Sequence, residues 1–468
     1  NTAIGLRDQA LATLVEHIGL PTPPTPDCQP IVVVNSLNWQ RSEVVQIDSL
    51  DVPDGQVMGI DGQVIPSQRL SNGHLAFVAE NIPPVGYRLF WWRPQDNATT
   101  GNTVATPDPH LYVLDNDYLR IHVDPVTGDL ASVFDKTQQR QVLSGAGNQL
   151  QAFVDQHKYW DAWNIDPDYE QHPLPPSELQ SISWIDCGSV CQRLRVVRTI
   201  ANSTLQQDYV LEASSPWLRI ETIADWQDYH LILKAAFPLA IQADYATYEI
   251  PCGAIQRPTQ STDPRQAAKW EVPALRWADL AGVSILNNCK YAYDSKPNQL
   301  RLTLLRGSCW PDPSADIGRH EFAYALYPHA GDWRAAQTVQ HGYAFNQPLQ
   351  VVVVPTLQQG MTQKPLPPEA CLLDLQANNL VLTALKPCEE NATQWILRCY
   401  EAHGQGANMH LTSDLGLEVV DRVDLLERSL SQSPQSAIDS CSVSIAPWQI
   451  ATLVIKVATH QGCTTASK

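Results

Sequence analysis

The sequence predicts a multidomain protein that is mostly β, with a single helix at its N-terminal end. Charged residues make up only 17% of the 468 residues, while Pro (35), Gly (23) and Trp (14) are plentiful. This composition is typical of short strands joined by turns rather than of long surface helices. Apolar residues also alternate with a period of two in many short runs, which indicates strands. The length favours two to four domains.

The predicted helix covers residues 2–18, where five apolar side chains from Ile4 to Ile18 fall near one face. One amphipathic helix cannot bury its own apolar stripe. We therefore expect it either to pack on the β-domains or to end a bundle whose other helices lie upstream. Residues 21–30 hold five prolines and predict a stiff, extended linker.

Three β-regions are expected after the linker. Residues 31–95 alternate short apolar runs with turns such as Asn72-Gly73, which predicts a small antiparallel β-domain. Residues 106–357 predict a large antiparallel β-sandwich, interrupted by long Pro-rich and aromatic-rich segments; such loops are usually functional or pack on another domain. Residues 370–458 predict a C-terminal β-sandwich. The expected fold is thus a large sandwich flanked by smaller ones.

The net charge of −18 disfavours nucleic acid and anionic membranes as partners, because both carry negative charge. A neutral substrate such as a sugar fits this charge better. The N-terminus carries neither Met nor a signal region, and we expect a processed or excised fragment. The 11 cysteines are odd in number and irregularly spaced, which favours free thiols in a reducing cytoplasm over disulfides.

Residues 147–170 are the most informative segment. They combine four aspartates with three aromatic residues: Asp155, Asp161, Asp166, Asp168, Tyr159, Trp160 and Trp163. This mixture binds carbohydrate, because aromatic faces stack on the C–H faces of a sugar while carboxylates accept hydrogen bonds from its hydroxyls. The alternative, an aromatic loop packed on another domain, stays open.

Two further segments contain candidate residues. In residues 306–329 the ionisable residues stand just before a predicted strand: Asp316, Arg319, His320 and Glu321. They indicate either the edge of a site or a surface turn with ordinary salt bridges. Residues 249–279 form another segment rich in Trp and Pro, with Arg257. None of the three segments is a motif by itself.

Together and in order they are more specific. The runs are VVVNSLNWQRSEVV, LDNDYLRIHVDPVTGDLASVFDK, GNQLQAFVDQHKYWDAWNID, EIPCGAIQRPTQ, KWEVPALRWADL and LRLTLLRGSCWPDPSADIGRHEFAYALYPH. Over residues 28–457 the chain resembles the C-terminal half of glycoside hydrolase family 38 α-mannosidases, closer to the cytosolic and bacterial members than to the Golgi type. Asn164 stands where the family more often has Asp, which removes a charge from the loop.

The resemblance implies a large sandwich of the galactose-mutarotase-like supersandwich type. It also implies a retaining exo-α-mannosidase, whose chemistry needs two carboxyls about 5–5.5 Å apart and a metal with an open position. In the family these groups belong to an N-terminal α/β barrel. The sequence shows no alternation of buried strands with long helices. We therefore expect no catalytic residue and no cofactor in this chain, zinc in the missing catalytic domain, and residues 1–20 as the remnant of a helical middle domain.

The His122-Val123-Asp124 triplet mimics the family's metal motif. Alternation along its predicted strand places His122 and Asp124 on the face opposite Ile121 and Val123, followed by a turn. This arrangement indicates a solvated strand face rather than a metal site.

The family's large β-domain packs beside the barrel and lends loops to the edge of the substrate cleft. The residues that the resemblance suggests for that edge, in order of preference, are Asp161, Trp163 and Asp166, then Arg319 and His320, then Arg257. Their expected roles are binding, orientation and support rather than proton transfer. In the alternative they stabilise only a domain interface.

Three functional hypotheses follow. The first is a hydrolase fragment, inactive alone, whose partners are its own N-terminal catalytic barrel and a mannose-containing glycan. The second is a free-standing, non-catalytic carbohydrate-binding β-sandwich protein. The third is a structural module, such as the interface of a homo-oligomer.

Overall fold

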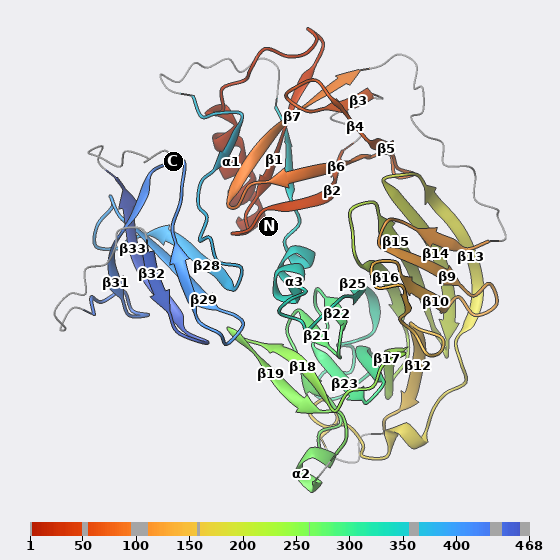
Figure 1. Cartoon of the computed structure of the whole chain (residues 1–468). Helices are drawn as coiled ribbons and strands as arrows, with labels where there is room; N and C mark the ends of the chain where they lie inside the picture. Colours follow the sequence, from red (N-terminus) through yellow and green to blue (C-terminus); the bar gives the residue numbers. More distant parts are fainter. Residues whose placement is uncertain are drawn as a thin grey trace.

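The computed structural model describes residues 2–48, 55–94, 111–156, 160–261, 263–354, 365–430 and 442–458. The predicted fold class is confirmed, since strands dominate these ranges and the ladders between named strands are antiparallel. Figure 1 shows three β-regions, coloured mainly red to orange, orange through green to teal, and blue. No helix within the described ranges has both the length and the apolar content that crossing a membrane requires.

The first β-region consists of two sheets that share one core. The larger sheet has the order β26-β1-β7-β3-β4, with β27 beside β7: β1 (Gln29–Asn35), β3 (Gly55–Met58), β4 (Val64–Ile65), β7 (Gly86–Pro94), β26 (Gln350–Val353) and β27 (Glu369–Cys371). The smaller sheet has the order β2-β6-β5: β2 (Arg41–Ile47), β5 (Ser67–Arg69) and β6 (Leu75–Ile82). Ile31, Phe77, Phe90 and Trp92 are buried between them.

Two strands of the larger sheet come from a distant part of the chain. β26 lies in the segment that we expected to close the large sandwich, but it pairs with β1, Val353 opposite Ile31. β27 pairs with β7 in the same sheet. The physical reason is that the inner strands of a buried sheet need hydrogen-bond partners along both edges. The division of the chain into domains stays a prediction, to which the structure adds this returning strand pair.

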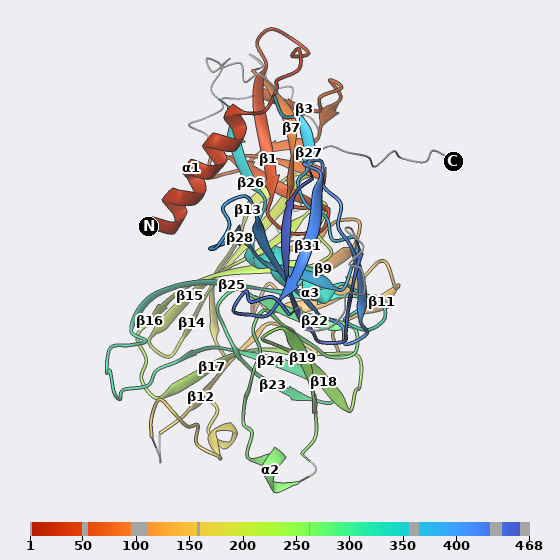
Figure 2. The same cartoon turned by 90° about the vertical axis from the view of Figure 1, so that its left-hand side faces the viewer.

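Helix α1 spans Thr2–Glu16 and packs its C-terminal end against this β-region (Figure 2). Val15 and Ile18 are buried in a cluster with side chains of β1 and β7. Ile4 and Leu6, in the first half of the helix, are more than half exposed. The helix thus packs on a β-domain through its C-terminal end. This is the first of the two arrangements that we expected, the other being the end of an upstream helix bundle.

The large sandwich contains three sheets. The first has nine strands in the order β13-β14-β15-β16-β25-β22-β21-β18-β19: β13 (Glu178–Cys187), β14 (Cys191–Ile200), β15 (Ser203–Glu212), β16 (Leu218–Trp226), β18 (Tyr245–Ile250), β19 (Gly253–Pro258), β21 (Trp277–Asp279), β22 (Val283–Asn287) and β25 (Gly318–Pro328). The second has the order β12-β17-β24-β23-β20: β12 (Gln149–Val154), β17 (Leu231–Pro238), β20 (Val272–Pro273), β23 (Ala292–Lys296) and β24 (Gln299–Arg306). The third has the order β11-β10-β9-β8: β8 (Val113–Asp115), β9 (Leu119–Val123), β10 (Leu130–Asp135) and β11 (Arg140–Gln141).

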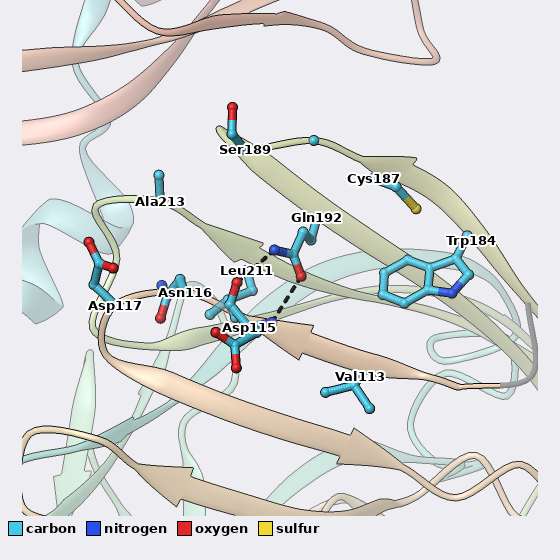
Figure 3. A pocket seen from close by; sticks show the side chains of 11 residues that line it. Val113, Asp115, Asn116, Asp117, Trp184, Cys187, Ser189, Gln192, Leu211 and Ala213 are labelled. Carbon is cyan, nitrogen blue, oxygen red and sulfur yellow. Dashed lines mark hydrogen bonds between the residues drawn. The ribbon is translucent and has the colours of Figure 1, made fainter. Parts of the chain in front are cut away.

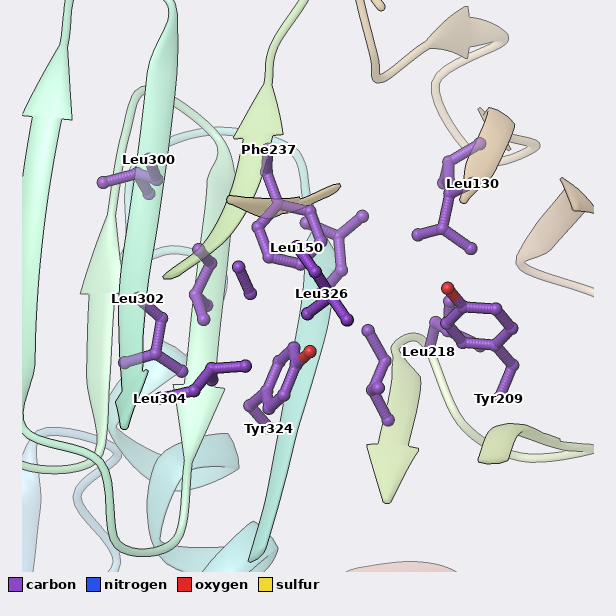
Figure 4. Close-up of a cluster of buried hydrophobic side chains, with 14 of the residues drawn as sticks. Leu130, Leu150, Tyr209, Leu218, Phe237, Leu300, Leu302, Leu304, Tyr324 and Leu326 are labelled. Carbon is purple, nitrogen blue, oxygen red and sulfur yellow. The ribbon is translucent and has the colours of Figure 1, made fainter. Parts of the chain in front are cut away.

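One hydrophobic core joins all three sheets. Leu130 from the third sheet, Leu150 and Phe237 from the second, and Tyr324 and Leu326 from the first belong to the same buried cluster (Figure 4). β16 supplies it by the alternation visible in the sequence, with every second side chain inward. Removing such a buried leucine side chain typically costs about 2–5 kcal/mol. This core therefore holds the three sheets together.

The C-terminal β-region completes the molecule. Its sheets are β28-β29-β33-β31 and β30-β32: β28 (Leu380–Pro387), β29 (Trp395–Glu401), β30 (Ala407–His410), β31 (Leu417–Val423), β32 (Ser442–Ile445) and β33 (Ile450–Val457). Helix α3 (Thr338–Asn346) lies at the centre of Figure 1 and packs between the large sandwich and this region. There the hydroxyls of Tyr343 and Tyr400 lie 3.2 Å apart. Two short helices, η1 (Tyr169–Gln171) and α2 (Pro264–Ala267), lie in loops of the large sandwich.

Candidate functional site

Three strands of the second sheet have ends that lie side by side. We call this end of the sheet its edge. Val154 of β12 lies opposite Leu231 of β17, and Ile232 of β17 lies opposite Arg306 of β24. Because neighbouring strands are antiparallel, the end of β12, the start of β17 and the end of β24 share this edge. The segments that leave from it are 155–172, 228–230 and 307–317. We call them the edge loops.

An ion pair ties the first edge loop to the end of β24. The Asp155 carboxylate, 2% exposed, accepts a hydrogen bond of 2.7 Å from Arg306 Nε. Its other oxygen accepts from the backbone N–H of Asp166 at 2.9 Å. Arg306 also donates to the main-chain carbonyl of Asn164. These charge-assisted bonds fold the loop back onto its own sheet.

Asp161 holds the same loop against the third one. It is 4% exposed, and its Oδ2 accepts from the backbone N–H groups of Cys309 and Trp310, the latter at 2.8 Å. The thiol sulfur of Cys309 lies 3.4 Å from Nε2 of His230. Burial, and next the negative charge of Asp161, raise the pKa of the Cys309 thiol. Near neutral pH this sulfur therefore keeps its proton.

Asp161, His230 and Cys309 thus come from three different edge loops. Their potential ligand atoms all lie within 4.8 Å of one another. His230 and Cys309, which stand 79 positions apart, were not among the residues predicted from the sequence. One signal was available: His230 directly precedes the strand-like run LILKAAFP, and Cys309 follows LRLTLLR closely. Pairing these two strands would have placed both residues at one edge.

Exposed tryptophans cover the outside of the edge loops. Trp160 is 72% exposed, Trp163 is 84% exposed and Trp310 is 57% exposed. The N–H groups of Trp163 and Asn164 both donate to the carbonyl of Trp160, at 2.8 and 3.1 Å, which closes a tight turn between the first two indoles. Tyr159, which we grouped with them, lies outside the described residues. Large aromatic side chains on a pinned loop form a contact surface for a sugar or for another domain.

The structure brings together Asp161, Trp163 and Asp166, the three preferred candidates, but on opposite sides of the loop. The two aspartates are buried. The main chain of Asp166 donates to Asp155 and accepts from the N–H of Tyr169 at 3.1 Å. The aspartates therefore build the loop, and Trp163 is the side chain that reaches the surface. Their roles toward a substrate stay predictions.

Arg319 and His320 lie at the start of β25, next to the third edge loop. Arg319 is exposed and pairs with Glu321 across 2.5 Å. His320 Nε2 lies 2.7 Å from the carbonyl oxygen of Asp316. Asp316 in turn accepts from the N–H and the hydroxyl of Ser308, both at 3.3 Å. Through Asp316 and Ser308, His320 is thus connected to the third edge loop, whose backbone N–H groups bind Asp161.

Arg257 lies in another place. It belongs to β19 and lines a cavity of about 330 Å³ together with Tyr169, Glu170, Tyr248 and Arg301. Its Nε is buried and has no hydrogen-bond partner among the described atoms. The cavity shares η1 with the first edge loop. Arg257 itself is not part of the cluster around Asp161.

A second cavity, of about 520 Å³, opens between β8 and the β13–β15 strands (Figure 3). The side-chain amide of Gln192 donates to the carbonyl of Asp115 at 2.6 Å and accepts from the N–H of Asp115 at 2.9 Å. Trp184 and Cys187 line its other side. None of the predicted site residues lines this cavity.

The His122-Val123-Asp124 triplet has the predicted alternation. Ile121 and Val123 are buried and His122 is exposed. The Asp124 carboxylate accepts from the N–H groups of the following turn, at 2.7 Å from Val126. Asp124 therefore acts as a turn-forming residue at the end of β9.

Comparison with known proteins identifies the family. Residues 114–314 match the model of the glycosyl hydrolases family 38 C-terminal domain, and residues 379–453 match that of the family 38 C-terminal beta sandwich domain. α-Mannosidase 2C1 of Mus musculus is 31% identical over 446 residues, 91% of this chain and 40% of that protein. The Homo sapiens protein is 30% identical over 451 residues, 92% of this chain and 40% of the relative. The chain thus spans about 40% of the length of these relatives.

The solved structures agree on the fold. An α-mannosidase from Enterococcus faecalis V583 superposes with a TM-score of 0.75 at 16% identity, over 96% of this chain and 58% of that chain. At this identity the likeness concerns the fold alone. The resemblance stated from the sequence motifs is therefore confirmed. The chain belongs to glycoside hydrolase family 38, of which it carries the C-terminal β-domains.

Proposed function

We propose that this chain is the non-catalytic C-terminal part of a retaining α-mannosidase that hydrolyses terminal α-mannosides, and that it works beside an N-terminal catalytic barrel. The observation that carries this proposal is the ordered match of two C-terminal family 38 models, together with relatives named α-mannosidases of which the chain spans about 40%. The ladders between named strands of the described residues are antiparallel. The parallel strands of an α/β barrel are not among them.

In this proposal the barrel supplies the chemistry. The nucleophile, the acid–base carboxyl and a zinc ion that holds substrate hydroxyls belong to it. This chain supplies support for the barrel and the rim of the cleft. The chain alone is then expected to be inactive.

The edge loops are the part that we assign to the rim of the substrate cleft. Trp163 and its exposed neighbours would stack on sugar rings, because indole faces bind apolar C–H faces. Asp161 and Asp166 would hold the loop in place. Arg319 and His320 flank it, and Arg257 lies farther away, beside η1. The same surface also suits a contact with the barrel, and the experiments below separate the two roles.

We propose two further features of the whole enzyme. The exposed apolar side chains of α1, Ile4 and Leu6, would pack on the helical middle domain of the family. The cysteines in the described ranges carry free thiols, which supports a reducing compartment, and we place the protein in the cytoplasm.

Turnover of an aryl α-mannoside in the presence of zinc tests the central proposal. The 468-residue chain should release no chromophore, and the chain extended by the upstream part of its gene should release it readily. Robust turnover by the chain alone would refute the proposal.

The rim is tested in the extended enzyme with Trp163→Ala. If Trp163 touches substrate in both ground and transition states, KM should rise several-fold with little change in kcat. Trp395→Ala is the matched control, because Trp395 is an exposed tryptophan in the C-terminal sandwich. Equal kinetics for the two variants would contradict a place at the rim.

The exposed tryptophans also favour a second function, a free-standing carbohydrate-binding protein. Calorimetric titration of the chain with mannose oligomers should then show heat that Trp163→Ala abolishes. No heat would count against this alternative.

Light scattering tests the third hypothesis, a structural module at the interface of a homo-oligomer. A monomer in solution would argue against a homo-oligomer built on the edge loops.

A further inference from the structure

We infer that Asp161, His230 and Cys309 form a binding site for one zinc ion, which joins the three edge loops. The inference rests on the edge of the second sheet and does not depend on the proposed function. Each loop contributes one ligand. The residues offer a carboxylate oxygen, an imidazole nitrogen and a thiol sulfur.

The spacing of these atoms suits a tetrahedral ion. Zinc binds sulfur at about 2.3 Å and nitrogen or oxygen at about 2.0–2.2 Å, so its ligand atoms stand roughly 3.3–3.8 Å apart. The Cys309 sulfur and His230 Nε2 already lie 3.4 Å apart. All the ligand atoms lie within 4.8 Å of one another. The remaining gaps between the ligand atoms are therefore at most about 1–1.5 Å.

The donor set selects zinc over the hard cations. Thiolate and imidazole bind borderline ions such as Zn²⁺ and Co²⁺, whereas Mg²⁺ and Ca²⁺ prefer oxygen ligands throughout. Three protein ligands leave a fourth position for water or another ligand. The thiolate is the form that binds a metal, so binding releases the Cys309 proton to solvent.

The surroundings hold the ligands in place. The Asp161 carboxylate is oriented by the N–H groups of Cys309 and Trp310. A carboxylate can accept both hydrogen bonds and still bind a cation. The main chain of His230 donates to Gly307 at 2.6 Å and accepts from Asp155 at 2.8 Å. Hydrogen bonds to a ligating carboxylate are typical of metal sites, and the main-chain bonds of His230 fix the position of its backbone.

The ion would act as a clamp on the loops that carry the exposed tryptophans. Trp310 follows Cys309 directly, and Trp163 lies two residues after Asp161. A bond network through the metal would join these segments to the start of β17. Zinc would therefore order the aromatic surface as well as stabilise the fold.

Metal titration of the 468-residue chain tests the inference. After treatment with a chelator, the protein should bind one equivalent of Zn²⁺ in competition with a chromophoric chelator. Co²⁺ should produce a thiolate-to-metal charge-transfer band. In Cys309→Ser the band should vanish and the affinity should fall about 100-fold or more, since even outer-shell changes cost 10–100-fold. Cys289→Ser is the control for background thiols, because Cys289 is an exposed free cysteine elsewhere.

A second variant keeps the test decisive. His230→Gln removes the nitrogen ligand and leaves the thiol, so it should weaken binding to a similar extent. Near-ultraviolet circular dichroism of the metal-free proteins checks that each variant folds. Zinc should raise the thermal midpoint of the wild type and of Cys289→Ser but not of the two ligand variants. The absence of saturable binding, or binding that survives in both Cys309→Ser and His230→Gln, would overturn the inference.

Discussion

The Asp155–Arg306 pair offers a sharp test of how the edge loops are held. Asp155→Asn keeps the size of the side chain and its ability to accept from Asp166, but removes the charge. The Asp155 side chain is 2% exposed and that of Arg306 is 18% exposed. Breaking a buried ion pair from one side costs about 3–5 kcal/mol. Because water reaches part of Arg306, we expect a loss of about 2–3 kcal/mol in the unfolding free energy.

Urea denaturation followed by tryptophan fluorescence and circular dichroism measures this loss as a lower midpoint at unchanged slope. Limited proteolysis should also cut residues 155–172 faster in Asp155→Asn. The matched control is Glu321→Gln, which breaks a pair whose partners are 63% and 64% exposed. Such a surface pair contributes at most about 0.5–1 kcal/mol. If Asp155→Asn destabilises no more than Glu321→Gln, the ion pair does not hold the loop.

Three other substitutions test the core and the pH dependence. Leu326→Ala, at a fully buried position, should cost about 2–5 kcal/mol in urea denaturation. Burial, and next the charge of His329, lower the pKa of His341 to about 4, so between pH 6.5 and 4 the unfolded chain binds a proton that the folded chain does not. Native stability therefore falls as the pH decreases through this window, and His341→Gln should recover up to about 3 kcal/mol at pH 4 relative to pH 7, measured by thermal unfolding. Burial raises the pKa of Glu212 to about 7, so its folded form keeps a proton that the unfolded chain releases, and stability falls as the pH rises from 4.5 to 7. Relative to the wild type, Glu212→Gln should thus be more stable at pH 7.5 than at pH 4.5. If the unfolding free energies of His341→Gln and Glu212→Gln vary with pH as that of the wild type does, these assignments are contradicted.

The strands were predictable because their signals are local. Alternation in residues 218–226 is visible in the sequence, and the structure buries every second side chain there. The partners of the strands were not predictable in the same way. β26 reads as an ordinary strand at the end of the large sandwich, yet it pairs with β1 near the N-terminus. No local pattern encodes such a pairing, since it depends on which edge of a distant sheet lacks a partner.

The candidate site shows the same division between local and distant signals. Asp161, Trp163 and Asp166 stand in one short segment, which its composition singled out and within which the family resemblance suggested these three residues. His230 and Cys309 became visible only when the register of β17 and β24 placed both beside Asp161. The family resemblance also suggested Arg257, as the last choice after Asp161, but β19 carries it to another cavity. Composition points to a candidate segment, whereas strand register decides which segments meet.

Asn164 illustrates why a departure from a family pattern has to be interpreted at the level of atoms. The loss of a charge at this position puts in doubt a carboxylate role there. In the structure, however, Arg306 binds the main-chain carbonyl of Asn164, which any residue provides. The side-chain oxygen of Asn164 accepts from the N–H of Ile165 at 3.0 Å, a bond that an aspartate would make equally well. The charge that holds the loop belongs to Asp155. The loop therefore tolerates Asn or Asp at position 164, because both residues offer the same main-chain carbonyl and the same side-chain acceptor.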